Sequence, residues 1–241
     1  EIRSSDWSSD VCSSDLPAAQ TVANLTKDIP IVASAITDYE GAKLIKSNNE
    51  PGGNLTGTSD MNPIKEQIDL LLKIAPNAKT IGCIYTSSEA NSEIQFKAMK
   101  EYAESKGLKV ESATISNVND IQQAAQSLVG KVDIFWEPTD NVIASAIPTL
   151  VSVTDAAKKP VICGEPNMVK NGGLATYGID YYELGKQSGH MAADILEGKS
   201  KPANMPIQFA KVLKAMFNKT DAAKLGITLS DDLLKDADVV E

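Results

Sequence analysis

The sequence contains few of the residues on which enzymatic and metal chemistry most often depends. It has one histidine and three cysteines among 241 residues, and aromatic residues make up 5%. His190 lies in a predicted helix with no second metal ligand nearby, which favours a structural or solvent-facing role. Cys83 and Cys163 stand inside apolar runs, where cysteine behaves as a small buried hydrophobic residue. Because neither a disulfide framework nor a metal-binding spacing is visible, we expect no metal and no cofactor.

Positive charge and long apolar runs are also scarce. The chain has 23 Lys and Arg against 32 Asp and Glu, a formal net charge of −9, which argues against a nucleic-acid partner. No apolar run reaches the roughly eighteen residues of a membrane span. The sequence has no Gly-x-Ser-x-Gly elbow and no glycine-rich phosphate loop, and Ser87-Ser88 would lack a base. These absences disfavour a hydrolase or an aldolase, so we expect no catalytic residues.

The first sixteen residues, Glu1–Leu16, differ from the rest of the chain. Ser-Ser-Asp occurs three times, at Ser4–Asp6, Ser8–Asp10 and Ser13–Asp15, with no helical or alternating apolar pattern between the copies. The segment resembles translated sequencing-adaptor read-through, and the alternative is a natural disordered tail. Cys12 follows no apolar stretch and does not fit a lipoprotein attachment site. We expect the authentic chain to begin near Pro17, with its true N-terminus missing.

From Pro17 onward, apolar strands alternate with helical patterns, after a predicted loop at Pro17–Asn24 that enters a helix. The predicted strands are Ile29–Ile36, Leu55–Thr58, Thr80–Tyr85, Leu108–Ile115, Asp133–Trp136, Pro160–Cys163, Leu174–Ile179 and Ile207–Phe217. The predicted helices are Gly41–Ser47, Ile64–Ala75, Glu93–Ser105, Asp120–Leu128, Asn141–Ala157, Tyr182–Glu197, Asp221–Leu225 and Asp231–Asp236. Pro148 predicts a kink or a break inside Asn141–Ala157. This alternation predicts an α/β fold with parallel sheets flanked by helices.

Short polar loops follow several of the predicted strands. They are Thr37-Asp38, the segment 86–92, Pro138–Asn141 and Gly164–Asn167. In parallel α/β sheets the loops at the carboxyl ends of the strands face one crevice, where ligands bind. Because hydroxyls, amides and carboxylates fill these loops, the pattern predicts that a small polar ligand is bound and not chemically changed.

Motifs spread along the chain resemble those of one protein family. They include Pro17-Ala-Ala-Gln, Pro51-Gly-Gly-Asn, Ser87-Ser-Glu-Ala-Asn-Ser, Gln122-Gln-Ala-Ala-Gln-Ser-Leu, Pro138-Thr-Asp-Asn, Met168-Val-Lys-Asn-Gly and Gly178-Ile-Asp-Tyr-Tyr-Glu-Leu-Gly. The order resembles ABC-transporter substrate-binding proteins whose better-known members bind tryptophan, phenylalanine or tyrosine. The resemblance covers nearly everything from Pro17 to the C-terminus. The departures are Pro148, the loop Gly164–Asn167 and the segment Phe209–Phe217.

The resemblance implies a two-lobed type I periplasmic-binding-protein fold. Residues 17–61 and 179–206 would be the remnant of the N-terminal lobe, from which about three strands and two helices are missing. Residues 62–178 and 207–241 would form the C-terminal lobe and tail. We expect the missing part to leave apolar surface and an open sheet edge, and ligand binding to need the upstream sequence.

The resemblance also implies a function. The full-length parent would be the extracytoplasmic solute-binding component of an ABC importer, either periplasmic or lipid-anchored, with its signal sequence absent from this fragment. Its partners would be a small amino-acid ligand and an ABC permease in the membrane. A ligand-sensing domain of a transcription regulator or signalling receptor, which uses the same fold, is the alternative.

A zwitterionic amino acid needs hydrogen-bond donors for its carboxylate and acceptors for its ammonium group. Loops that open helices supply free N–H groups, which makes Ala18, Gln20, Thr37, Ser87 and Ser88 candidates for the carboxylate. Capping of the following helices by Thr37 or Ser88 is the structural alternative. An aromatic ligand side chain also needs an apolar pocket, but the sequence does not choose among Tyr85, Trp136, Tyr177 and Tyr181.

Asp140 and Glu165 are the predicted acceptors for the ammonium group. Asp140 could instead cap the next helix, and Glu165, in a loop without a recognised capping pattern, could simply be exposed. Asp38, Asn91 and Asn141 complete the predicted ligand-binding set, with capping as the alternative for Asn91. Asp180 is a candidate hinge residue.

Overall fold

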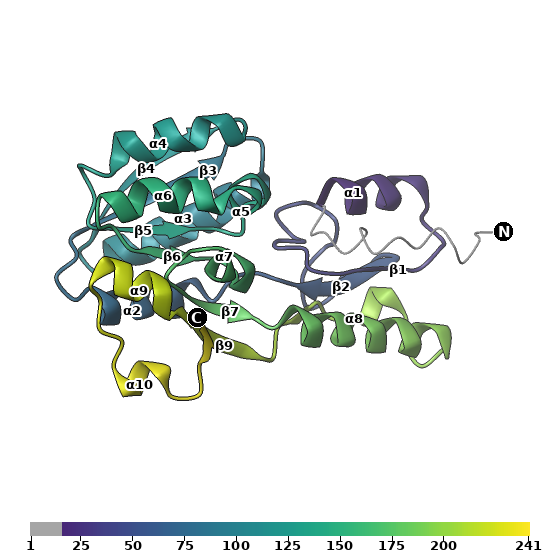
Figure 1. The fold of residues 1–241 in the computed structure, drawn as a ribbon. Coiled ribbons are helices and arrows are strands. Elements are labelled where there is room, and N and C mark those ends of the chain that lie inside the picture. Colours follow the sequence, from purple (N-terminus) through teal and green to yellow (C-terminus); the bar gives the residue numbers. More distant parts are fainter. Residues whose placement is uncertain (1–15) are drawn as a thin grey trace. The chain divides into compact units, whose positions relative to one another are not determined.

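Strands and the helices between them make up most of residues 16–241, the part of the chain that the computed structural model describes. The expected adaptor-derived segment, including Cys12, lies outside the described residues apart from Leu16. The chain forms two compact units (Figure 1). Unit 1 contains the described residues up to Met61 together with Asp180–Val212, and unit 2 contains Asn62–Ile179 together with Leu213–Glu241.

Unit 1 is built on a three-stranded parallel sheet of order β1-β2-β8. The strands are β1 (Ile31–Ala33), β2 (Leu55–Ser59) and β8 (Gln208–Phe209), and the helices are α1 (Leu16–Leu25), α8 (Tyr181–Leu196) and the 3-10 turn η3 (Pro202–Asn204). The core contains Ile36, Tyr39, Leu55 and Ile207. Within the described residues β1 is an edge strand, and Leu25 and Ile29 near it are largely exposed.

Gly57 shows how tightly β1 and β2 pack. Its φ is 154°, and a Cβ atom there would lie 1.8 Å from the carbonyl oxygen of Ala33 and 2.5 Å from the hydroxyl oxygen of Tyr39. The fully buried Tyr39 donates from that hydroxyl to the carbonyl oxygens of Ala33 (3.0 Å) and Thr58 (2.9 Å). Only glycine, which has no Cβ atom, leaves room for this close approach of β1, β2 and Tyr39.

Several predictions for unit 1 were wrong. Pro17–Asn24 is not a loop but part of α1, and the strand predicted at Ile29–Ile36 shrinks to β1. Gly41–Ser47 forms turns and no helix, because Lys43 adopts φ 57° and the Asp38 carboxylate accepts from Gly41 N at 2.9 Å. Ile207–Phe217 is two strands, since the chain passes from unit 1 to unit 2 between them.

Unit 2 contains a seven-stranded sheet of order β10-β9-β7-β6-β5-β3-β4. The strands are β3 (Thr80–Thr86), β4 (Lys109–Ile115), β5 (Ile134–Glu137), β6 (Val161–Cys163), β7 (Ala175–Ile179), β9 (Leu213–Asn218) and β10 (Asp238–Val240). Pairing is parallel except between β7 and β9, where Tyr177 lies opposite Ala215. The prediction of parallel strands therefore holds for most of the sheet and fails at β9.

Helices cover both faces of this sheet. They are α2 (Ile64–Ile74), α3 (Ala90–Ser105), the 3-10 turn η2 (Val118–Asp120), α4 (Ile121–Leu128), α5 (Asn141–Ser145), α6 (Ile147–Ala156), α7 (Pro166–Lys170), α9 (Lys219–Leu225) and α10 (Asp231–Leu234). Figure 1 shows α4 and α6 side by side, and their apolar residues pack with Ile84, Phe135 and Cys163 in one core cluster. The predicted break at Pro148 is confirmed, because α5 ends at Ser145 and Pro148 is the second residue of the separate helix α6.

Two negative findings concern the described residues alone. Among residues 16–241, no helix combines the length and apolar character needed to cross a bilayer. From Leu16 onward, no three His, Cys, Asp or Glu side chains are grouped so that they could hold a metal ion. Cys83 and Cys163 are free and buried, as predicted.

Candidate ligand-binding surfaces

In unit 2 the predicted polar loops do lie at the carboxyl ends of β3, β5 and β6. Ser87 and Ser88 directly follow β3 and are exposed. Ser87 N donates to the carbonyl oxygen of Ile115 at the end of β4 (3.0 Å). Neither serine caps α3, whose N-cap residue is Glu89 and makes no side-chain cap. Their hydroxyl groups are therefore not used as helix caps.

Asp140 adopts the structural alternative, the N-cap of α5. One carboxylate oxygen accepts from Ile143 N (3.0 Å) and from the Thr86 hydroxyl (2.8 Å), and the other accepts from Thr86 N (2.7 Å). The side chain is fully buried. Three donors from two elements hold this carboxylate, so Asp140 joins the end of β3 to the start of α5.

Glu89 links the loops after β3 and β5. Its Oε2 atom accepts from Asn141 N (3.0 Å), Asn141 Nδ2 (3.1 Å) and Asn91 Nδ2 (3.4 Å). Asn91 also donates to the carbonyl oxygen of Thr139 (2.9 Å), so it lies inside α3 as a bridge and does not cap the helix. Asn141 is exposed. The predicted residues Asn91 and Asn141 are thus brought together by an acid that the sequence interpretation did not select.

Glu165 is the N-cap of α7, a short helix that was not predicted. Its two oxygens accept from Asn167 N (2.7 Å) and Met168 N (2.8 Å). Burial raises the pKa of the Glu165 carboxyl, while the two backbone donors oppose that shift. The expectation that this carboxylate lacks a capping role was wrong. The signal was present in the sequence, since Pro166 follows Glu165 and proline favours the first helical position.

A buried amide network near the same strand ends was also missed. Asn62 Nδ2 donates to Gln95 Oε1 (2.7 Å), which also accepts from Thr139 N (3.2 Å), and Gln95 Nε2 donates to the Thr139 hydroxyl (2.5 Å). A Cβ atom on Gly164 would lie 2.6 Å from Thr139 N and 2.9 Å from Asn62 Nδ2. The close approach draws the loops after β5 and β6 together around Asn62.

The aromatic candidates differ in their availability. Trp136 is fully buried and donates from Nε1 to Gln67 Oε1 (2.9 Å). Gln67 Nε2 in turn donates to the carbonyl oxygens of Gly164 (3.2 Å) and Tyr177 (3.0 Å). Tyr85 stacks on Phe96 with ring centroids 4.7 Å apart. Trp136 therefore belongs to the core of unit 2, where Gln67 connects it to Gly164 after β6 and to Tyr177 within β7.

In unit 1 the predicted residue Thr37 contacts an acid that was not predicted. Its hydroxyl donates to Asp60 Oδ1 (3.0 Å), and the Tyr181 hydroxyl donates to Asp60 Oδ2 (3.3 Å). With no helix at Gly41–Ser47, capping by Thr37 is ruled out. Asp60 directly follows β2, so the rule used for the other strand ends would have found it. The sequence interpretation predicted a strand at Leu55–Thr58 but did not select Asp60.

The remaining unit 1 candidates lie apart from this contact. Ala18 and Gln20 are inside α1, Ala18 is exposed, and Gln20 Nε2 donates to the carbonyl oxygen of Ala42 (3.5 Å). A residue this far inside a helix donates its own N–H to the carbonyl four residues earlier, so Gln20 N is not free. Asp180 caps α8 by accepting from Glu183 N (3.1 Å). Ligand contact by any residue of this set stays a prediction.

Comparisons with known proteins agree with this architecture. Residues 11–241 match the family model described as ABC transporter substrate binding protein. The chain is 45% identical over 184 residues to a tyrosine-binding protein of Clostridioides difficile strain R20291, a match that covers 76% of this chain and 53% of that protein. The chain thus spans about half the length of this relative.

Two solved structures are similar over most of the chain. One, from Streptococcus pneumoniae, is described as the ABC domain in complex with L-Trp, with 44% identity and a TM-score of 0.87 over 93% of this chain and 76% of that one. The other is an open, ligand-free substrate-binding protein with adhesive properties from Clostridium difficile, with 38% identity and a TM-score of 0.78 over 94% and 76%. The predicted type I periplasmic-binding-protein fold is confirmed. The chain belongs to the ABC transporter substrate-binding protein family.

Proposed function

We propose that this protein is the extracytoplasmic solute-binding component of an ABC importer and that its ligand is an amino acid with an aromatic side chain. The observation that carries the proposal is the similarity, at 44% identity and a TM-score of 0.87, to a structure that holds L-Trp. The 45% identity to a tyrosine-binding protein supports the same ligand class. The partner of the ligand-bound protein would be a permease in the membrane.

The strand-end chemistry fits a binder better than a catalyst. Ser87 and Ser88 offer hydroxyl groups, Asn91 and Asn141 offer amides, and among residues 16–241 the single histidine is an exposed residue of α8. The carboxylates of Asp140 and Glu165 at these strand ends already accept hydrogen bonds from backbone N–H groups. Such groups recognise the charged ends of an amino acid and have no evident means of breaking a bond.

We propose a division of roles among the predicted ligand-binding residues. Ser87, Ser88, Asn91 and Asn141 in unit 2, and Ala18, Gln20, Thr37 and Asp38 in unit 1, are the candidates for direct contact. Asp140 and Glu165 fix the loops that carry such contacts, because their oxygens already accept hydrogen bonds within the fold.

A thermal-shift screen of the protein with its upstream sequence restored tests this function. The twenty amino acids, glucose, ribose and adenosine are each added at increasing concentration. Tyrosine, tryptophan and phenylalanine should raise the melting temperature progressively, because a ligand at about 100 times its Kd stabilises the folded state by about 2.7 kcal/mol. For a chain of this size that corresponds to a shift of roughly 5–10 °C. Stabilisation by the sugars or adenosine alone would discard the amino-acid assignment.

A further inference from the structure

Asp60 lies where three distant segments of unit 1 meet. It follows β2 directly, Thr37 comes from the loop after β1, and Tyr181 is the first residue of α8. The Thr37 hydroxyl lies 3.0 Å from Asp60 Oδ1, and the Tyr181 hydroxyl lies 3.3 Å from Asp60 Oδ2. The Asp60 residue is only 1% exposed, whereas Tyr181 is 37% exposed. A buried carboxylate is thus held beside an aromatic side chain that is still partly open to solvent.

This carboxylate has no cationic partner in the described structure. Asp60 takes part in none of the ion pairs formed by residues 16–241. Both of its partners from other residues are neutral hydroxyl groups, although a carboxylate offers about four acceptor positions. Buried charges in proteins are normally paired, because desolvation of an isolated charge is costly.

Burial has the expected effect on this group. Desolvation raises the pKa of the Asp60 carboxyl to about 6, although the hydrogen bonds from Thr37 and Tyr181 act in the opposite direction. A nearby cation would reverse the effect of desolvation. A binding partner with a positive charge would therefore be favoured at this position.

Two other buried acids, Asp140 and Glu137, are accounted for by the fold. Asp140 accepts from three donors, and two of them are backbone N–H groups. Glu137 lies within strand β5 and accepts from Ile84 N of the adjacent strand. Asp60, like Asp140, lies beyond a strand end, where ligands of α/β proteins bind. It differs because its donors from other residues are hydroxyls.

We propose that the Asp60 carboxylate accepts the ammonium group of the amino-acid ligand, with Thr37 and Tyr181 as the residues that position it. The inference rests on the proposed function, since it requires a ligand with a free α-ammonium group. The ammonium group would supply the missing positive charge and up to three N–H donors. This assignment replaces the earlier expectation that Asp140 and Glu165 fill this role, and it makes Thr37 a positioning residue in place of a direct contact.

The proposal has a consequence for pH. The ammonium group pairs with the ionised carboxylate, so a proton on Asp60 competes with the ligand. With a pKa of about 6, only about a tenth of Asp60 is ionised at pH 5, and affinity should fall about tenfold between pH 7.5 and pH 5. The titratable groups that face Asp60 are the phenols of Tyr39 and Tyr181. Burial raises the pKa of Tyr39 above its ordinary value of 10, so this phenol stays neutral throughout that range.

Isothermal titration calorimetry with L-tyrosine tests the proposal on the protein with its upstream sequence restored, because we expect ligand binding to need that sequence. The des-amino analogue 3-(4-hydroxyphenyl)propionate is titrated in parallel at pH 5, 6 and 7.5. Wild-type affinity for L-tyrosine should fall about tenfold from pH 7.5 to pH 5, and affinity for the analogue should not fall. Equal pH dependence for both compounds would overturn the proposal, whatever the variants do.

The variants separate direct contact from general damage. Asp60→Asn keeps the shape of the side chain and should lower affinity for L-tyrosine at least tenfold at pH 7.5, about the strength of one charge-assisted hydrogen bond. It should leave the analogue unaffected. Asp28→Asn, at an exposed acid of the same unit, is the matched control and should bind normally. Thr37→Val and Tyr181→Phe each remove a donor that lowers the pKa of Asp60, so the midpoint of the pH profile should move upward.

The outcomes distinguish this proposal from the proposed function. If the wild-type protein with its upstream sequence restored binds no aromatic amino acid at any pH, the proposed function fails. If it binds L-tyrosine and Asp60→Asn binds L-tyrosine equally well, only the assignment of Asp60 fails.

Discussion

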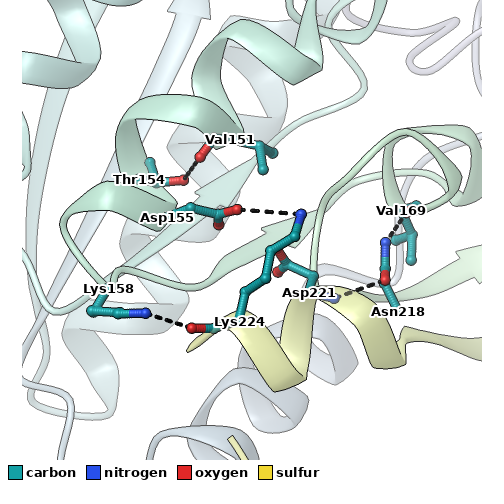
Figure 2. Close-up of polar contacts among 8 residues, drawn as sticks. All are labelled: Val151, Thr154, Asp155, Lys158, Val169, Asn218, Asp221 and Lys224. Carbon is teal, nitrogen blue, oxygen red and sulfur yellow. Dashed lines mark hydrogen bonds and ion pairs between the residues drawn. The ribbon is translucent and has the colours of Figure 1, made fainter. Parts of the chain in front are cut away.

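Replacing Asp221 by asparagine should stabilise unit 2 at alkaline pH and leave its stability unchanged at acidic pH. Asp221 lies in α9, is 2% exposed, and its Oδ1 atom has no hydrogen-bond partner. Figure 2 shows its side chain beside Asp155 of α6 and Lys224. Lys224 Nζ lies 3.8 Å from Asp155 Oδ2, and its charge also lowers the pKa of Asp221, so this cation acts on both acids. Asparagine has the same shape but cannot ionise.

The magnitude follows from the pKa. Desolvation first, and then the charge and hydrogen bond of Asp155, raise the pKa of Asp221 from 3.8 to about 7. The folded state therefore keeps a proton that the unfolded chain releases, and stability falls as the pH rises from about 4 to about 7. At about 1.4 kcal/mol for each pH unit, the full difference is at most about 4 kcal/mol. The side chains of Asp155 and Lys224 are 20% and 55% exposed, so solvent screens these charges. We therefore expect a difference in the free energy of unfolding of about 2 kcal/mol.

Urea titrations at pH 4 and pH 8 measure this effect. Trp136 is fully buried in unit 2, so its fluorescence in a Trp7→Phe background reports the unfolding of that unit. Asp221→Asn should raise the free energy of unfolding by about 2 kcal/mol at pH 8 and by less than about 0.5 kcal/mol at pH 4. The double variant Asp155→Asn/Asp221→Asn should gain nothing further at pH 8, because the first substitution already removes the repulsion.

Two results would refute the reasoning. One is an equal effect of Asp221→Asn at both pH values, which would mean that packing and not ionisation decides it. The other is a loss of stability at pH 8, which would mean that the charge of Asp221 is favourable in the folded state.

Three further predictions follow from other contacts. Asp133 has a lowered pKa because Lys79 N and Thr80 N donate to its carboxylate. In urea titrations, Asp133→Asn should therefore lower the free energy of unfolding by about 1 kcal/mol at pH 7 and by less at pH 3. A larger loss at pH 3 would contradict this. Gln67→Leu leaves Trp136 Nε1 and two carbonyl oxygens without their partner and should lower the free energy of unfolding by about 3 kcal/mol. The fluorescence of Trp136 measures this loss, and Lys65→Leu, at an exposed position of the same helix, is the control. Asp140→Ala and Glu165→Ala should each weaken ligand binding at least tenfold in calorimetry, because the loops lose their caps. Glu165→Gln keeps an acceptor and should bind the ligand more tightly than Glu165→Ala. Normal binding by both alanine variants would contradict the loop-holding role.

Most of unit 2 could be predicted because its pattern is local. The buried strand at Thr80–Thr86, the amphipathic helix at Ile64–Ile74 and the break at Pro148 depend on residues close together in the sequence. The antiparallel strand β9 could not be predicted in the same way. Its direction is set by pairing with β7, some forty residues earlier in the chain. The sequence of β9 does not indicate which strand it pairs with.

Unit 1 was harder to predict because tertiary contacts outweigh local propensity there. The segment Gly41–Ser47 has helix-forming residues, but the Asx-type hydrogen bond from Gly41 N to Asp38 and the left-handed Lys43 replace the helix by turns. The contact between Thr37 and Asp60 depends on the parallel register of β1 and β2, in which Ala33 lies opposite Gly57. Proximity of the two side chains is a property of the folded sheet, so their separate positions in the sequence did not reveal it.

The position of a carboxylate at a strand end was predictable, but its role depends on the donors that the fold supplies. Asp140 and Glu165 accept from backbone N–H groups of the helices that follow them, so their hydrogen bonds form as soon as those helices form. Asp60 is followed by no helix at that point, and the donors it receives from other residues are two side-chain hydroxyls. A hydroxyl can rotate away or accept a new bond, whereas a capping N–H group is fixed by the helix. This difference in donors makes Asp60 the acid whose remaining acceptor positions a ligand can use at the least cost to the fold.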